Sequence, residues 1–146
     1  MEEINITDAF YILGFVDGEG SFNISFKDNN DYRFGLKISA SFNISQKELK
    51  ILEWIRSKFN CGTIRSRHDG VFYYEVTSVK DLWMVIIPFF NKYKLRTKKL
   101  VAFNVFSRSV EMMISNEHLN RDGIMKIFKL RDSLKVGRKR KHKLGD

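Results

Sequence analysis

The feature that most constrains the fold is a long stretch in which apolar and polar side chains alternate. Between residues 33 and 44, every even position from Phe34 to Ile44 is apolar, and the odd positions carry small or polar residues. A period of two is typical of a β-strand with one buried face. A shorter alternation over Ser21–Lys27 precedes it, and Lys27–Asp31 favours a turn. Together the two runs predict an antiparallel hairpin.

The rest of the chain predicts a second hairpin and a set of amphipathic helices. Strands at Thr63–Arg67 and Val71–Thr77 flank a turn at His68–Gly70. The expected helices are Ile6–Asp17, Gln46–Phe59, Val79–Phe90, Thr97–Met113 and Glu117–Leu134. Their expected boundary residues are Thr7 or Asp8, Ser45 and Thr97 as N-caps, and Pro88 as a helix end. The order αββαββα, followed by extra helices, predicts an α+β domain over residues 1–134. In this domain the helices cover one face of a four-stranded antiparallel sheet.

Composition bounds the class of protein. Of 146 residues, 43% are hydrophobic, including 13 Phe, which is enough for the core of one domain. The single cysteine, Cys61, cannot form an internal disulfide. No apolar run reaches the roughly 18 residues that span a bilayer, and the N-terminus does not resemble a signal or transit peptide. We therefore expect no membrane partner. Abundant Phe, Ile, Lys and Asn with one Pro is the bias of an A+T-rich genome, which favours a chloroplast or mitochondrial product over a bacterial or phage one.

The net charge of +9 suggests a polyanionic partner, but the charge is unevenly distributed. Residues 121–146 hold ten Lys and Arg against three Asp, a net of +7, which leaves only +2 for residues 1–120. Residues 135–146 are expected to form a basic tail, either disordered or in contact with DNA, although a targeting signal or no role is also compatible. The evidence for nucleic acid must come from the body of the chain.

The polar face of the predicted sheet could bind nucleic acid. An antiparallel sheet can leave one face in water, and a β-ribbon fits the DNA major groove. The expected DNA-binding residues are the side chains of this face: Asn23, Ser25, Lys27, Arg33, Lys37, Ser39, Ser41, Asn43, Arg65, Arg67, Tyr73, Glu75 and Thr77. An ordinary solvated face would show the same alternation. Five cations against a single acid favour nucleic acid.

The segment Tyr11–Phe22, YILGFVDGEGSF, is unusual for a helix. Gly14 and Gly18 lie four residues apart and so share one helix face, where small residues let two backbones approach closely. Acids at a helix C-terminus are disfavoured by the helix dipole, and a cation would relieve them. If two copies of this helix packed across a two-fold axis, two Glu19 carboxylates would converge and could hold Mg²⁺ or Mn²⁺. A plain core helix that ends at a glycine is the simpler alternative.

This segment resembles the signature helix of the LAGLIDADG homing endonucleases. The resemblance continues through FNISFK, the second strand, SQKELKILEWI, the second hairpin and the PFF and LRTKK segments, over most of residues 5–110. It implies the family's αββαββα fold, whose four-stranded sheet forms a saddle on DNA. It also implies a divalent-metal-dependent, site-specific DNA endonuclease.

The resemblance assigns roles residue by residue. Glu19 stands at the family's metal-binding acid, where the Gly18 carbonyl can assist, and Asp17 stands at an earlier acid that is structural. The expected catalytic residues, including those that arrange water and cations near the scissile phosphate, are Glu19, Gln46, Lys50, Lys98 and Arg96. The register across FFNKYK leaves the choice between Arg96 and Lys98 as the active-site cation open.

One copy of the motif implies a homodimer and a long, pseudo-palindromic target that is cut on both strands. The expected dimer interface is Tyr11, Leu13, Gly14, Phe15, Asp17 and Gly18. Such a protein is expected to be intron-encoded, to promote intron mobility, and to take double-stranded DNA rather than a small molecule as substrate. An RNA-binding intron maturase and a non-catalytic DNA-binding protein on the same fold are the alternatives.

Overall fold

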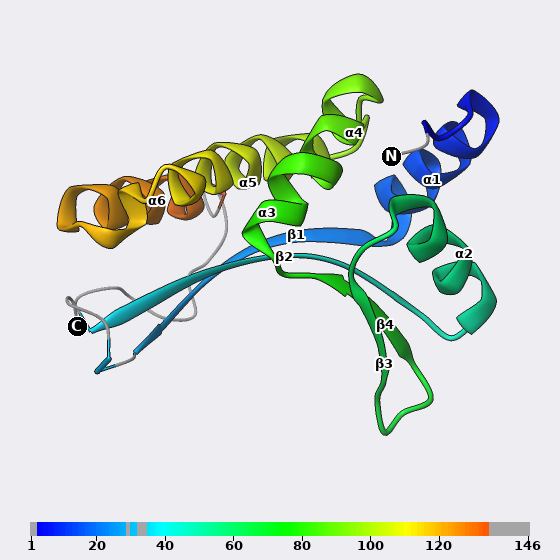
Figure 1. Cartoon of the computed structure of the whole chain (residues 1–146), viewed down its shortest axis with the longest axis horizontal. Helices are drawn as coiled ribbons and strands as arrows, with labels where there is room; N and C mark the ends of the chain where they lie inside the picture. The colour runs from blue at the N-terminus through cyan, green and yellow to red at the C-terminus, as the bar shows by residue number, and fades with distance from the viewer. Residues whose placement is uncertain (1–2, 29, 32–34, 135–146) are drawn as a thin grey trace.

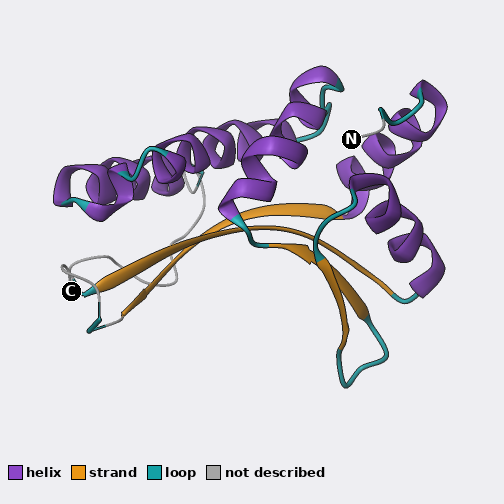
Figure 2. Cartoon of the chain, in the orientation of Figure 1, coloured by secondary structure: helices purple, strands orange, loops and turns teal. Residues whose placement is uncertain are grey.

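The computed structural model describes residues 3–28, 30–31 and 35–134, and its arrangement is an arched sheet with helices above it (Figure 1). Four antiparallel strands form one sheet in the order β1-β2-β4-β3. The strands are β1 (Gly20–Asp28), β2 (Leu36–Gln46), β3 (Thr63–Ser66) and β4 (Phe72–Val76). All the helices lie on one side of the sheet (Figure 2). The predicted α+β architecture is therefore confirmed.

The helices follow the order expected from the sequence. They are α1 (Ile6–Glu19), α2 (Leu49–Phe59), α3 (Val79–Asp81), the π-helix η1 (Leu82–Ile86), α4 (Ile87–Lys92), α5 (Lys99–Ile114), the 3₁₀-helix η2 (Glu117–Leu119) and α6 (Arg121–Ser133). Among the described residues, no helix is both long and apolar enough to cross a membrane.

The register of the sheet explains the alternation in the sequence. β1 and β2 pair from Gly20–Ile44 to Asp28–Leu36, which places the even-numbered apolar residues of both strands on one face. β2 and β4 pair only from Phe42–Val76 to Gln46–Phe72. Residues 36–41 of β2 therefore extend beyond β4 with β1 as a two-stranded arm.

An aromatic cluster ties the helices to the sheet. The Phe22 ring lies 5.2–5.4 Å from the rings of Phe42, Phe90, Phe103 and Phe106, measured between centroids. Such ring pairs contribute about 0.5–1.5 kcal/mol each beyond the burial of their area. The cluster holds α4 and α5 against β1, and so fixes the start of α5 near the end of α1.

The N-caps of α1 and α2 differ from the prediction. α1 is capped by Asn5, whose side-chain oxygen accepts from the Asp8 amide at 2.9 Å, rather than by Thr7 or Asp8. Ser45 does not cap α2, because β2 remains paired with β4 through Gln46 and the helix begins only at Leu49. Pairing with a distant strand overrides the local capping signal at Ser45.

The later helices are more divided than predicted. Pro88 does not end a helix but lies in the first turn of α4, which continues directly from the π-helix η1. The Ile87 amide donates to the Leu82 carbonyl at the end of η1, so helical backbone runs up to Pro88, which itself has no N–H to donate. The expected helix over Glu117–Leu134 is split into η2 and α6, since Asn120 is extended and its side chain accepts from the Gly123 amide to cap α6. The predictions for Arg33, Phe34 and the basic tail fall outside the described residues.

Candidate active site and nucleic-acid interface

Asp17, near the end of α1, holds the segment that leads into α5. Its carboxylate accepts from the amides of Arg96 and Thr97 at 2.8 and 3.0 Å and from the Thr97 hydroxyl at 2.6 Å. Partial burial opposes ionisation of this carboxyl, but the bonds from Thr97 and Arg96 and the charge of Lys99 hold its pKa below the usual range. These are the contacts of a residue that positions its neighbours.

Lys99 is the lysine that meets the end of α1. Its Nζ donates to the carbonyl oxygens of Asp17 and Gly18, each at 3.1 Å. Those carbonyls belong to the helix C-terminus, where the backbone carries partial negative charge and a cation is favoured. The predicted N-cap Thr97 precedes the start of α5 by two residues, although its hydroxyl does accept from the Lys99 amide at 3.2 Å.

Sequence reasoning missed Lys99, yet the sequence contains a signal for it. Lys99 is spaced four, seven and eleven residues before Phe103, Phe106 and Val110, all of which are buried. It therefore lies on the inward face of α5. The predicted Arg96 and Lys98 are exposed, and in the described structure no hydrogen bond or ion pair joins either side chain to the end of α1. Their catalytic assignment stays a prediction.

Glu19 is the last residue of α1 and is exposed. Among the described residues its carboxylate has no hydrogen-bond or ion-pair partner, and the Gly18 carbonyl comes directly before it along the chain. A free carboxylate at the negative end of a helix dipole is a suitable ligand for a hard cation. In the described part of the chain, no group of three or more His, Cys, Asp or Glu could hold a metal ion by itself.

Gln46 and Lys50 lie in one groove on the flank of α1. This groove, of about 490 Å³, is also lined by Tyr11, Phe15 and Trp54. Gly20 pairs with Ile44, so Gln46, two residues further along β2, lies at the end of the sheet where α1 finishes. The Gln46 side-chain oxygen accepts from the Lys47 amide at 3.0 Å. The structure therefore brings Gln46 and Lys50 together, on one side of the helix that carries Glu19.

The outer face of α1 is unusually open. A Cβ atom added at Gly14 or Gly18 would meet nothing within 4 Å outside its own helical turns. Phe10 and Tyr11 flank this strip with 55% and 57% of their surface exposed, and a second groove of about 900 Å³ runs along the Phe10 side. Leu13, by contrast, is 8% exposed and packs in the core, so it has little surface left for a partner.

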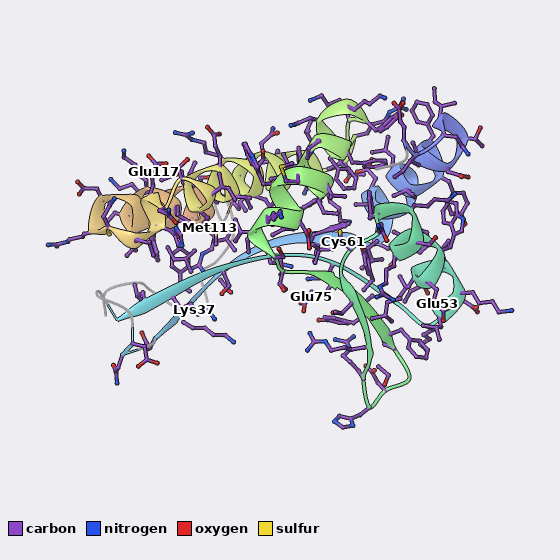
Figure 3. All side chains as sticks on the ribbon, viewed as in Figure 1. Lys37, Glu53, Cys61, Glu75, Met113 and Glu117 are labelled. Carbon is purple, nitrogen blue, oxygen red and sulfur yellow. The ribbon has the colours of Figure 1, made fainter. Side chains whose placement is uncertain are left out.

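The face of the sheet away from the helices carries the predicted nucleic-acid residues. Cross-strand pairs put Lys27 opposite Lys37, Ser25 opposite Ser39, and Asn23 opposite Ser41. Further along the sheet, Asn43, Glu75 and Thr63 form one row, and Tyr73 and Arg65 form the next. Figure 3 shows Lys37 and Glu75 on the side opposite to the helices. The twelve described members of the predicted set therefore lie on β1–β4 or directly at their ends.

The lysines of this face have no ion-pair partner among the described residues. Lys27 and Lys37 are exposed and directly opposite each other, an arrangement that is unfavourable in a free sheet. Glu75 pairs with Arg65 at 2.7 Å, and Arg67 lies over the Tyr73 ring at 4.6 Å. Two uncompensated lysines on one arm suit a phosphate backbone.

Comparison with known proteins gives a consistent result. The model of the LAGLIDADG endonuclease family matches residues 12–110. Probable intron-encoded endonuclease 2 of Neurospora crassa is 34% identical over 131 residues, which is 87% of this chain and 29% of that protein. The chain spans 24–29% of the length of the first three curated relatives it matches.

Solved structures share the whole arrangement. The homing endonuclease I-TnaI is 30% identical with a TM-score of 0.83, and the match covers 93% of this chain and 91% of that chain. I-SmaMI, bound to an uncleaved DNA target in the presence of calcium ions, is 33% identical with a TM-score of 0.85. In that case the match covers 94% of this chain and 47% of the other.

Proposed function

The chain belongs to the LAGLIDADG endonuclease family, and from this membership we propose that it is an intron-encoded homing endonuclease. It makes a site-specific double-strand break in a long, pseudo-palindromic DNA target and so promotes intron mobility. The observation that carries the proposal is the Glu19 carboxylate at the end of α1, which has no partner among the described residues and lies next to the Lys99 contact, above a sheet whose polar face is rich in cations.

Glu19 is the residue that would hold the metal ion, with the Gly18 carbonyl as a second oxygen ligand. Mg²⁺ or Mn²⁺ fits this donor set because such ions prefer oxygen and keep several waters, so that few protein ligands are needed. When bound, the ion activates water and stabilises charge on the phosphate. Lys99 brings a positive charge to the same helix end, where it can offset negative charge on a scissile phosphate. Gln46 and Lys50 line the neighbouring groove, from which they can orient water.

A homodimer accounts for the rest of the site. The open strip at Gly14 and Gly18 allows a second α1 to approach closely, with Tyr11 and Phe15 beside it. Asp17 and Leu13, at the inner edge of this contact, support the helix from within the subunit. The match covers 47% of the I-SmaMI chain, so the rest of that chain is about as long as a second unit of similar size. Two copies would bring two Glu19 carboxylates together and join two sheets into one DNA-binding surface.

Duplexes that the wild type binds can be selected from a random library and then incubated with Mg²⁺. We expect cleavage of both strands at one position, and no cleavage by Glu19→Gln although that variant still binds the duplex and dimerises. Loss of binding or dimerisation in Glu19→Gln would instead make the acid structural. No cleavage by the wild type, together with tight binding to intron RNA, would support the maturase alternative and overturn this proposal.

A further inference from the structure

A single acid interrupts the cationic surface of the sheet. Among the described open-face residues, Glu75 carries the only carboxylate, and it accepts from the Arg65 Nη2 atom at 2.7 Å. The Glu75 side chain is 19% exposed, whereas that of Arg65 is 64% exposed. The carboxylate is therefore mostly buried, whereas the guanidinium is exposed above it. An acid here repels phosphates, so a favourable effect of Glu75 on DNA binding would act through Arg65.

The ion pair is diagonal across two paired strands. Arg65 is directly opposite Tyr73, and Glu75 is opposite Thr63 and Asn43. Both side chains therefore start from backbone that the sheet holds in place. A guanidinium is planar with five N–H donors, and the bond to Glu75 fixes one corner of it while the remaining edge is free.

The other arginine of this hairpin is held differently. Arg67 lies over the Tyr73 ring, 4.6 Å from its centroid, and its Nε is 3.8 Å from the Asp69 carboxylate. The flat face of the Arg67 guanidinium packs against the Tyr73 ring, and both partners, Tyr73 and Asp69, are close to the turn. Of the two, Arg65 is the one that hydrogen-bonds a carboxylate, at one corner of its guanidinium, and its other edge faces outward.

The surface beside the pair is hollowed. Arg65 and Glu75 border a depression of about 460 Å³ beside the part of β2 that β4 does not cover. Its polar lining includes Ser39, Ser41 and Thr77, and Val79 and Met113 line it from the helix side. A depression that opens beside the polar face of the sheet can admit the edge of a base rather than only the phosphate backbone.

We propose that Glu75 positions Arg65 to read a guanine in each half of the DNA target. This inference rests on the proposed function, because it requires that the open face binds duplex DNA. Two parallel N–H groups of a fixed guanidinium match the O6 and N7 acceptors of guanine in the major groove. Glu75 is then a positioning residue for sequence specificity, and Arg65 is the residue that contacts the base.

The test compares base preferences of the wild type, Glu75→Gln, Arg65→Lys and the double variant, by selecting duplexes with Ca²⁺ in place of Mg²⁺. We expect the wild type to prefer guanine at one position per half-site, by about 5-fold to about 100-fold. Glu75→Gln should lose most of that preference and leave the other positions unchanged. Arg65→Lys should also lose it, and adding Glu75→Gln to Arg65→Lys should change nothing further. Lys37→Met is the control, because removing a phosphate contact weakens binding to all sequences alike.

Two other results overturn the inference. If Glu75→Gln binds every duplex more tightly with an unchanged base profile, the pair is only a surface ion pair. If Arg65→Lys weakens binding evenly across sequences, Arg65 contacts phosphate. A wild type without any base preference contradicts the proposed function itself, and a preference that ignores both substitutions contradicts only the inference. Thermal melting of each variant separates these results from misfolding.

Discussion

Replacing Asp17 by Asn should destabilise the fold measurably, because the substitution removes one hydrogen-bonded carboxylate. Three hydrogen bonds end on this carboxylate, two from backbone amides and one from the Thr97 hydroxyl. Hydrogen bonds to charged groups contribute about 1.5–3 kcal/mol each, but Asn keeps one acceptor oxygen and the site is partly solvated. We therefore expect Asp17→Asn to lower the free energy of unfolding by about 1–3 kcal/mol at neutral pH.

The pH dependence of this loss gives a sharper test. The pKa of folded Asp17 lies below the ordinary value of 3.8, so its contribution is present above that pH and is lost as the pH falls through the folded pKa. The stability difference between the wild type and Asp17→Asn should therefore shrink in acid. Urea titrations at a series of pH values would measure it, with Asp8→Asn as the control. Asp8 pairs with Lys58 near the surface, and its substitution should cost about 1 kcal/mol or less.

The result that would refute this reasoning is a difference that stays constant as the pH is lowered from neutral to well below the ordinary carboxyl pKa of 3.8. Equal stability of the two proteins at neutral pH would also refute it. Cleavage gives a second readout, because the same bonds hold the segment that carries Lys99. Asp17→Asn should cut more slowly than Asp8→Asn under conditions where both are fully folded.

Three further predictions concern association, packing and DNA binding. Gly14→Ala should stabilise the isolated subunit by up to about 1 kcal/mol, because the space around Gly14 is open. The same substitution should weaken self-association, measured by sedimentation velocity, and tighter association would contradict the α1 contact. Phe42→Ala should cost about 3–5 kcal/mol in urea unfolding, since the ring is fully buried in the aromatic cluster, and a loss under 1 kcal/mol would mean the cluster is not a cooperative core. Lys27→Ala should reduce the slope of log affinity against log salt concentration by about 1, whereas an unchanged slope would place Lys27 away from phosphate.

The sheet could be predicted because the alternation of apolar and polar residues follows directly from which side of each strand is buried. Phe22, Ile24, Ile38 and Phe42 all face the core, as the period of two requires. The element boundaries depended on contacts that are distant in sequence. Ser45 has the chemistry of an N-cap, but pairing with Tyr73 keeps it in β2.

The site was only partly predictable for the same kind of reason. The unusual acids at the end of a glycine-containing helix identified Glu19 and Asp17. Among the adjacent cations Arg96, Lys98 and Lys99, the choice depends on helix rotation, and a shift of one residue turns a side chain by about 100°. The spacing of the buried residues Phe103 and Phe106 determines that rotation, and the rotation places Lys99 on the inward face of α5. The split of α3, η1 and α4 around Pro88 had no such signal in the sequence.

The most direct test of the central claim is a subunit-mixing experiment. Wild type and Glu19→Gln are unfolded, refolded together at fixed total concentration, and assayed for nicking and for double-strand cleavage of the selected target with Mg²⁺. If each cutting centre is completed by a second Glu19 across the dimer axis, mixed dimers should cut neither strand, and the total number of strands cut should fall as the square of the wild-type fraction. Nicked product from mixed dimers, with the total number of strands cut falling in direct proportion to the wild-type fraction, would show that one chain carries a complete centre, and would contradict this account.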